Sequence, residues 1–128
     1  MRRYLVDGMN VIGSRPDGWW RNLDAAVIGL TRTLAIWRAA EDIGATVVFD
    51  GARPPGLDDV DPGGLEVAFV GRGRAADDEI VRRVGVDPDA GSLAVITSDR
   101  PLAERVRAAG AGDVMGAGRF RRLLDRYC

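Results

Sequence analysis

Short apolar segments alternate with helix-like segments along this chain, and no other feature of the sequence constrains its fold as strongly. Five such segments read as strands, at residues 4–6, 46–49, 65–70, 93–97 and 114–115. Apolar runs without polar alternation are typical of parallel strands that are buried on both faces. Strands that alternate with helices predict a parallel sheet between two helical layers. We therefore expect a three-layer α/β domain with a central, mostly parallel sheet of about five strands.

The spacing of apolar residues predicts a long helix after the first strand, with members at Val27, Leu30, Leu34 and Trp37. Three- and four-residue spacing places these side chains on one helix face. Asn22 or Asp24 is a candidate cap for its start. We expect the helix to reach about Ile43 and Gly44 to end it.

The remaining connections are predicted from turn formers and caps. Asp7 and Gly8 indicate a turn after the first strand, and residues 12–23 resemble a loop. Asp77 or Asp78 is expected to cap the next helix, and Pro101 suits the first turn of the one after it. With 128 residues, the chain has the length for one core, so we expect a single domain over residues 1–128.

Missing residue types exclude several kinds of chemistry. The chain has no His and no Lys, all 18 basic residues are Arg, and the single Cys is Cys128. Ser-His-Asp and Cys-His triads, Schiff-base lysines, a P-loop lysine and His- or Cys-based zinc sites are therefore excluded. An enzyme built on this chain would depend on carboxylates, Arg, hydroxyls, backbone groups or an oxygen-bound metal.

The net charge and the lengths of the apolar stretches limit which partners and which cell compartment we expect. The formal net charge is -1, which argues against strong non-specific binding to polyanions but allows a local basic patch. No apolar stretch is long enough to cross a membrane, and the first residues lack the apolar core of a signal peptide. We expect a cytoplasmic protein with no membrane contact, no internal disulfide and an exposed Cys128 thiol.

Aspartates gather where the predicted strands end. Asp7, Asp50 and Asp99 each follow a strand, and Asp77 and Asp78 stand where a helix begins. In a parallel sheet these positions share one edge, where ligands bind in such folds. Neighbouring carboxylates raise one another's pKa unless a cation neutralises them, and Mg²⁺ prefers oxygen ligands. Any one of these residues is more often a turn former or a cap, but the set together favours a metal site.

Four motifs occur in an order that resembles the YacP-like branch of the NYN domains, which are relatives of PIN-domain nucleases. Val-Asp-Gly-Met-Asn-Val-Ile at residues 6–12 resembles the opening motif of that branch. Residues 47–50 resemble the second strand of that branch with the Asp that follows it. Residues 67–70 and 76–80 resemble its third strand and the helix start after it. Ile-Thr-Ser-Asp at residues 96–99 resembles the fourth strand of that branch. The resemblance spans about the whole chain.

The resemblance implies a PIN-like fold and metal-dependent endoribonuclease activity with Mg²⁺ or Mn²⁺. By position, Asp7, Asp77 and Asp99 would be the catalytic acids that hold the metal, and Asp50 and Asp78 are further candidate ligands or structural acids. Asn10 would orient Asp7 or contact substrate. Thr97 and Ser98 would hydrogen-bond around the metal or the phosphate.

One departure from the family pattern keeps an alternative open. Pro101 stands where the wider NYN pattern often has another Asp, which favours one tightly held metal over two. The alternative function is an RNA-binding module with weak or no catalysis. A phosphatase or receiver-like domain is a third reading, but the Lys that those sites use is missing.

Arginines and tryptophans supply the candidate substrate contacts. Arg72, Arg74 and Arg100 lie near the aspartates in sequence, and Arg binds phosphate in a bidentate manner. Trp19 and Trp20 could stack on unpaired bases, although one ring packed on the core and one partly exposed is the commoner arrangement. The expected partner is RNA, with mRNA, tRNA and rRNA not distinguished, and the resemblance leaves an association with the ribosome open.

Overall fold

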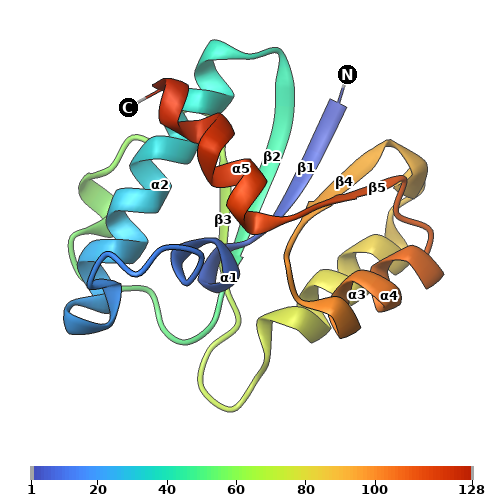
Figure 1. Cartoon of the computed structure of the whole chain (residues 1–128), viewed down its shortest axis with the longest axis horizontal. Helices are drawn as coiled ribbons and strands as arrows, with labels where there is room; N and C mark the ends of the chain where they lie inside the picture. The colour runs from blue at the N-terminus through green and yellow to red at the C-terminus, as the bar shows by residue number, and fades with distance from the viewer. Residues whose placement is uncertain (1, 128) are drawn as a thin grey trace.

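A five-stranded, all-parallel sheet forms the centre of the computed structural model, which describes residues 2–127 (Figure 1). Its strand order is β3-β2-β1-β4-β5. The strands are β1 (Arg2–Asp7), β2 (Ile43–Phe49), β3 (Glu66–Phe69), β4 (Leu93–Ile96) and β5 (Asp113–Met115). Val6 of β1 is in register with Val47 of β2 and Ile96 of β4, so the carboxyl ends of the central strands meet at one edge. The predicted α/β fold is confirmed, with every strand pair parallel.

Five helices cover the two faces of this sheet. One face carries α1 (Gly8–Ile12), α2 (Leu23–Ala40) and α5 (Ala117–Leu124), and the other carries α3 (Ala76–Val86) and α4 (Arg100–Ala108) (Figure 1). Short 3₁₀ turns lie at Trp19–Arg21, Leu57–Asp59, Ala90–Ser92 and Asp125–Tyr127. Within residues 2–127, none of the helices is both long and apolar enough to cross a membrane.

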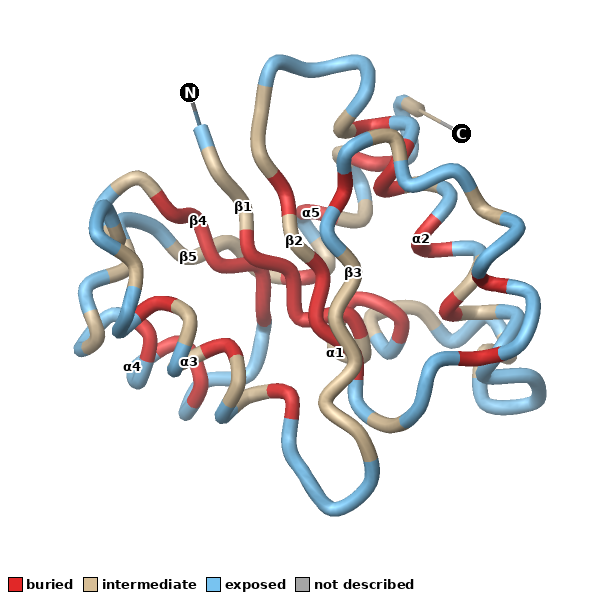
Figure 2. The backbone as a smooth tube through the Cα atoms, turned by 180° about the vertical axis from the view of Figure 1, so that it is seen from behind, coloured by how far each residue is buried: buried red, intermediate tan, exposed pale blue. Residues whose placement is uncertain are grey.

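Two apolar cores result from the alternation of side chains along the central strands. Val6 packs in the core under α2 and α5, whereas its neighbour Leu5 packs in the core under α3 and α4. Trp37, buried in the first core, makes edge-on ring contacts with Tyr4 and Phe120. Figure 2 shows the buried residues concentrated in the central strands and on the inward sides of the helices. Burial on both faces explains why these strands are continuous apolar runs.

The long helix is shorter than its apolar spacing predicts. It ends at Ala40, Glu41 is already extended, and Ile43 and Gly44 belong to β2. The prediction that Gly44 ends the helix is wrong, because Gly44 pairs with Arg3 of β1 and this long-range pairing outweighs the local signal. At the other end, the Asn22 cap is confirmed by the Ala25 N–H, which donates to Asn22 Oδ1 at 3.0 Å.

The turn predicted after the first strand is a helix instead. Residues 8–12 form α1, which follows β1 directly and packs on α2 and α5. Gly8 is required there, because a Cβ at this position would stand 2.4 Å from Cε1 of Phe49. The expectation for Cys128 lies outside the described residues.

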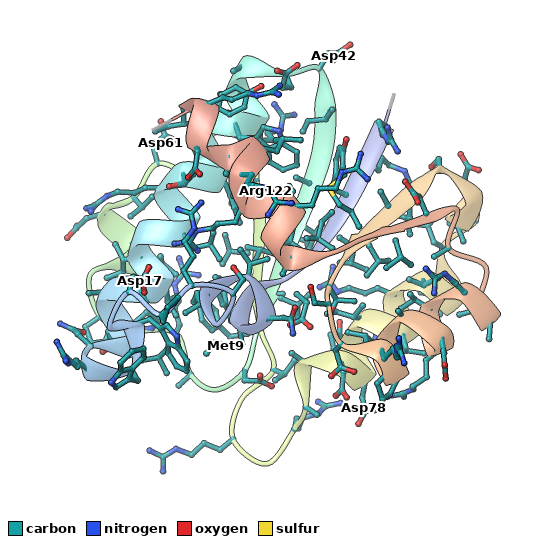
Figure 3. All side chains as sticks on the ribbon, in the orientation of Figure 1. Met9, Asp17, Asp42, Asp61, Asp78 and Arg122 are labelled. Atoms are coloured by element: carbon teal, nitrogen blue, oxygen red, sulfur yellow. The ribbon has the colours of Figure 1, made fainter. Side chains whose placement is uncertain are left out.

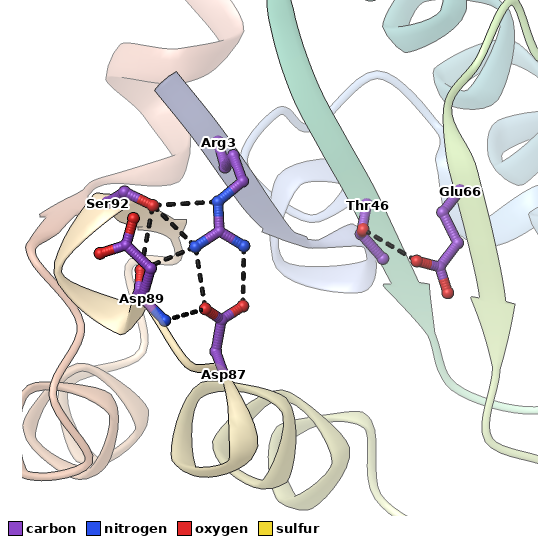
Figure 4. A network of polar contacts seen from close by, with 6 residues as sticks. All are labelled: Arg3, Thr46, Glu66, Asp87, Asp89 and Ser92. Atoms are coloured by element: carbon purple, nitrogen blue, oxygen red, sulfur yellow. Dashed lines mark hydrogen bonds and ion pairs between the residues drawn. The ribbon is translucent and has the colours of Figure 1, made fainter. Parts of the chain in front are cut away.

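A polar network fixes the amino-terminal part of the sheet to the segment that follows α3 (Figure 4). The Arg3 guanidinium donates to Asp87 Oδ2 at 2.7 Å and Oδ1 at 2.9 Å, and it also donates to Ser92 Oγ and the Asp89 carbonyl. The bonds that Asp87 accepts from Arg3 and from the Asp89 backbone N–H lower its pKa to about 2. These contacts tie β1 to the segment after α3, which gives this end of the sheet a structural role.

Candidate active site at the carboxyl edge of the sheet

Four aspartates line one cavity of about 370 Å³ at the carboxyl edge. Asp7 ends β1, Asp50 follows β2, Asp99 follows β4, and Asp77 lies in the first turn of α3. The other lining residues are Met9, Asn10, Ala75 and Ala76. Four of the five predicted acids are thus brought together by the parallel register of the strands.

Asp7 is the one buried acid of this group, with 8% of its surface exposed. Burial is the main cause that raises its pKa from 3.8 to about 6. The Thr97 hydroxyl, which donates to Oδ2 at 3.0 Å, and the Asn10 backbone lower the pKa, while the negative charges of Asp50 and Asp99 raise it. Near neutral pH the site therefore holds an ionised carboxylate that lacks a compensating positive charge.

Thr97 joins two of the candidate metal ligands. Its hydroxyl donates to Asp7 and accepts from the Asp99 backbone N–H at 3.1 Å, while its own backbone N–H donates to the Met115 carbonyl at 2.9 Å. The ends of β1, β4 and β5 are therefore tied together through one buried residue. This geometry gives Thr97 a positioning role beside the predicted contact with metal or phosphate.

Asn10 and Ser98 connect the same elements from the cavity side. Asn10 Oδ1 accepts the Ser98 backbone N–H at 2.8 Å, and Ser98 Oγ accepts the Ala117 N–H at 2.8 Å, at the start of α5. Asn10 also lines the acidic cavity. Both side chains hold α1, β4 and α5 together, and their predicted substrate contacts stay predictions.

Asp50 and Asp99 also act as helix caps. Asp50 Oδ1 accepts the Ala76 N–H at 2.8 Å at the start of α3, and Asp99 Oδ1 accepts the Leu102 N–H at 3.1 Å at the start of α4. The structural and the functional interpretations of these acids are therefore compatible, since a carboxylate has a second oxygen. The cap predicted for α3 is wrong, because Ala75 holds the N-cap position and the carboxylate of Asp50, distant in sequence, accepts the Ala76 N–H.

Asp77 and Asp78 lie in different environments. Asp77 lines the acidic cavity, whereas Asp78, labelled in Figure 3, lines a neighbouring cleft of about 630 Å³ between β3 and α3. Arg105 of α4 pairs with Asp78 at 2.9 Å and approaches Asp77 to 3.8 Å. Asp78 is therefore placed beside the site rather than within it. The sequence did not indicate Arg105, because only the packing of α4 on α3 brings it here.

The predicted substrate arginines are all exposed. Arg74 lines the cleft that contains Asp78, while Arg72 and Arg100 lie outside the residues that line the acidic cavity. Two other arginines near the motifs are engaged elsewhere, with Arg53 paired to Asp58 and Arg15 to Asp125. Arg74 is thus the best placed of the three.

The donor chemistry of the cavity fits a hard divalent cation. Its donors are carboxylate oxygens, which Mg²⁺ and Mn²⁺ prefer, and a cation would neutralise the buried charge of Asp7. Across the described residues 2–127, however, no three acidic, His or Cys side chains stand in a ready ligand set. To hold an ion, the carboxylates that line the cavity would have to move closer together.

Comparison with known proteins gives a consistent result. A family model described as the YacP-like NYN domain matches residues 4–127. The crystal structure of Rae1 (YacP) from Bacillus subtilis is 26% identical, with a TM-score of 0.80 over 99% of this chain and 75% of that one. A point mutant of Rae1 gives 24% identity and a TM-score of 0.77 over 98% and 75% of the two chains. No curated protein sequence matched this chain.

Proposed function

Because the chain belongs to the family of YacP-like NYN domains, a PIN-like nuclease family, we propose that it is a divalent-metal-dependent endoribonuclease. The observation that supports this most strongly is the cavity lined by Asp7, Asp50, Asp77 and Asp99. RNA as the substrate, and Mg²⁺ or Mn²⁺ as the cofactor, rest on the family and on the carboxylate donors.

Asp7, Asp77 and Asp99 are the residues that would hold the cation, with Asp50 on the same cavity wall and Asp78 beside it. A bound cation supplies an activated water and stabilises the leaving oxygen of a phosphodiester. Thr97 keeps one oxygen of Asp7 in place through its 3.0 Å hydrogen bond. Asn10 and Ser98 hold α1 against β4, so that the position of Asp7 at the start of α1 is fixed.

Arginine side chains would supply the contacts to the RNA backbone. Arg74 lines the cleft next to the acidic cavity. Arg72 and Arg100 are exposed and lie close in sequence to Asp77 and Asp99. Their guanidinium groups can bind phosphate oxygens in a bidentate manner, which positions a strand without reading its sequence. This arrangement would bring a phosphodiester toward the aspartates while leaving the choice of RNA to other contacts.

Removal of the metal is expected to abolish cleavage. Unstructured RNA incubated with the protein and Mn²⁺ should yield internal cleavage products on a denaturing gel, and excess chelator should suppress them. Structured RNA of the same length tests whether single-stranded substrate is preferred. Products that persist in chelator would contradict a metal-dependent mechanism.

The arrangement around Asp77 favours a second candidate function, an RNA-binding module with little catalysis. Arg105 approaches Asp77, and the described residues hold no ready ligand set. Pro101 also stands where the wider family pattern often has a further acid. Retention of RNA without product, under both Mg²⁺ and Mn²⁺, would support this candidate over the nuclease.

A further inference from the structure

A second cleft, of about 330 Å³, opens between α1, the Trp19–Arg21 turn and α2. Ile12, Ala26 and Leu30 form its apolar part, Trp19 lies at its wall, and Asp17 and Arg121 are polar members of its lining. We propose that this cleft binds an unpaired nucleobase of the RNA strand whose backbone crosses the acidic cavity. The proposal rests on the proposed function, because that function supplies the strand.

The chemistry of the lining suits a base better than a phosphate. An aromatic ring and aliphatic side chains offer a surface for a flat, apolar face. Arg121 can donate and Asp17 can accept, and a base edge carries groups of both kinds, whereas a phosphate would be repelled by Asp17. Arg121 stands 3.5 Å from Asp17 and 3.4 Å from the Val11 carbonyl, which are long contacts that a ligand could replace.

The short helix α1 connects the two sites. Met9, at the start of α1, lines the acidic cavity, and Ile12, at its end, lines the second cleft. Because the same short helix borders both sites, one RNA strand could follow α1 from one site to the other. Figure 3 labels Met9 on α1 and Asp17 in the loop that follows it.

The 3₁₀ turn that supplies Trp19 to this cleft carries a second feature suited to RNA. Trp20 is 55% exposed, its ring meets Trp19 edge-on at 5.8 Å, and the Arg21 guanidinium lies 5.9 Å from its ring centre. Gly18, with a φ of 86°, allows the turn in which Trp19 packs inward and Trp20 outward. Aromatic rings beside a guanidinium are the groups that stack on unpaired bases and attract the backbone.

Filling the cleft tests this proposal without removing a core side chain. Gly29 of α2 lines the cleft, and a Cβ there would meet nothing within 4 Å, so Gly29→Leu adds bulk to the open space. Gly85→Leu is the matched control, since a Cβ at Gly85 of α3 also meets nothing and α3 lies on the other face of the sheet. Both variants should unfold at or slightly above the temperature of the wild type, because each replaces a glycine inside a helix.

Fluorescence anisotropy in chelator measures binding of a labelled unstructured RNA and of an abasic oligomer of equal length. We expect Gly29→Leu to weaken binding of the RNA about tenfold, as for the loss of one stacked base, and Gly85→Leu to leave it unchanged. The abasic oligomer should bind weakly and equally to all three proteins.

Two outcomes would overturn the base site: RNA binding by Gly29→Leu that equals the wild type, or abasic binding as tight as that of RNA. The proposed function fails separately. If the wild type cleaves no RNA with any metal but Gly29→Leu still weakens RNA binding, the base site stands and the nuclease is refuted.

Discussion

The Asp7→Asn variant is expected to lose RNA cleavage and yet to be more stable than the wild type above pH 6. Burial raises the pKa of Asp7 from 3.8 to about 6, so the folded protein binds a proton that the unfolded chain has released. The free energy of unfolding of the wild type therefore falls as the pH rises from about 4 to 6. A shift of this size corresponds to about 3 kcal/mol at pH 8. Asparagine carries no charge and can still accept from Thr97, so the variant avoids this loss.

Urea unfolding between pH 4 and pH 8, together with RNA cleavage in Mn²⁺, measures both effects. The stability difference should be largest at pH 8 and shrink to a small remainder at pH 4, where Asp7 is protonated in the folded protein and partly protonated in the unfolded chain. Asp113→Asn is the control, because Asp113 begins β5 at the opposite end of the sheet and is an exposed partner of Arg2. An Asp7→Asn protein that cleaves RNA, or that is less stable than the wild type at pH 8, would contradict this account of Asp7.

The Gly8→Ala variant is expected to lose about 1–3 kcal/mol of stability and most of its RNA cleavage. The new Cβ would stand 2.4 Å from Phe49 Cε1 and 3.1 Å from Val47 Cγ2, and both side chains are fully buried. Phe49 also stacks on Phe69 at 5.3 Å, which limits its freedom to move aside. Relief of the clash requires α1 to shift, and that shift would move Asn10 away from its bond with Ser98.

Gly29→Ala is the matched control for this substitution. It lies inside α2 with open space around a Cβ, so it should raise stability by about 0.5–1 kcal/mol through helix propensity. Thermal unfolding compares the two variants directly. A Gly8→Ala protein as stable as Gly29→Ala would show that the contact between α1 and Phe49 is not tight.

The sheet and the acidic edge could be predicted because both follow from local patterns. Apolar runs marked the strands, and an Asp after a strand in a parallel sheet must lie at its carboxyl edge, which is where Asp7, Asp50 and Asp99 are found. For the tryptophan pair, the sequence predicted one ring packed on the core and one partly exposed, and the structure shows Trp19 packed and Trp20 exposed.

The details that could not be predicted depend on contacts between distant segments. Pairing with β1 draws Gly44 into a strand, and packing against Phe49 explains Gly8 in α1. The cap of α3 comes from Asp50, far away in sequence, and Arg105 reaches Asp77 and Asp78 only because α3 and α4 lie side by side. Local residue spacing in the sequence does not predict any of these contacts.

Asp50 and Asp99 are both helix caps and candidate metal ligands, so a substitution at either residue changes two properties. Asp50 and Asp99 each satisfy a backbone N–H at the start of a helix, so their replacement by Ala would remove a cap worth about 1 kcal/mol as well as a candidate ligand. Asn also caps helices well, and substitution by Asn therefore separates loss of chemistry from loss of fold.

Calorimetric titration of the wild type and Asp7→Asn with Mn²⁺ at pH 8 tests most directly whether this cavity holds a divalent cation. The account predicts saturable binding to the wild type and to Asp113→Asn, and its loss in Asp7→Asn. Equal binding by Asp7→Asn, or no binding by the wild type, would contradict it.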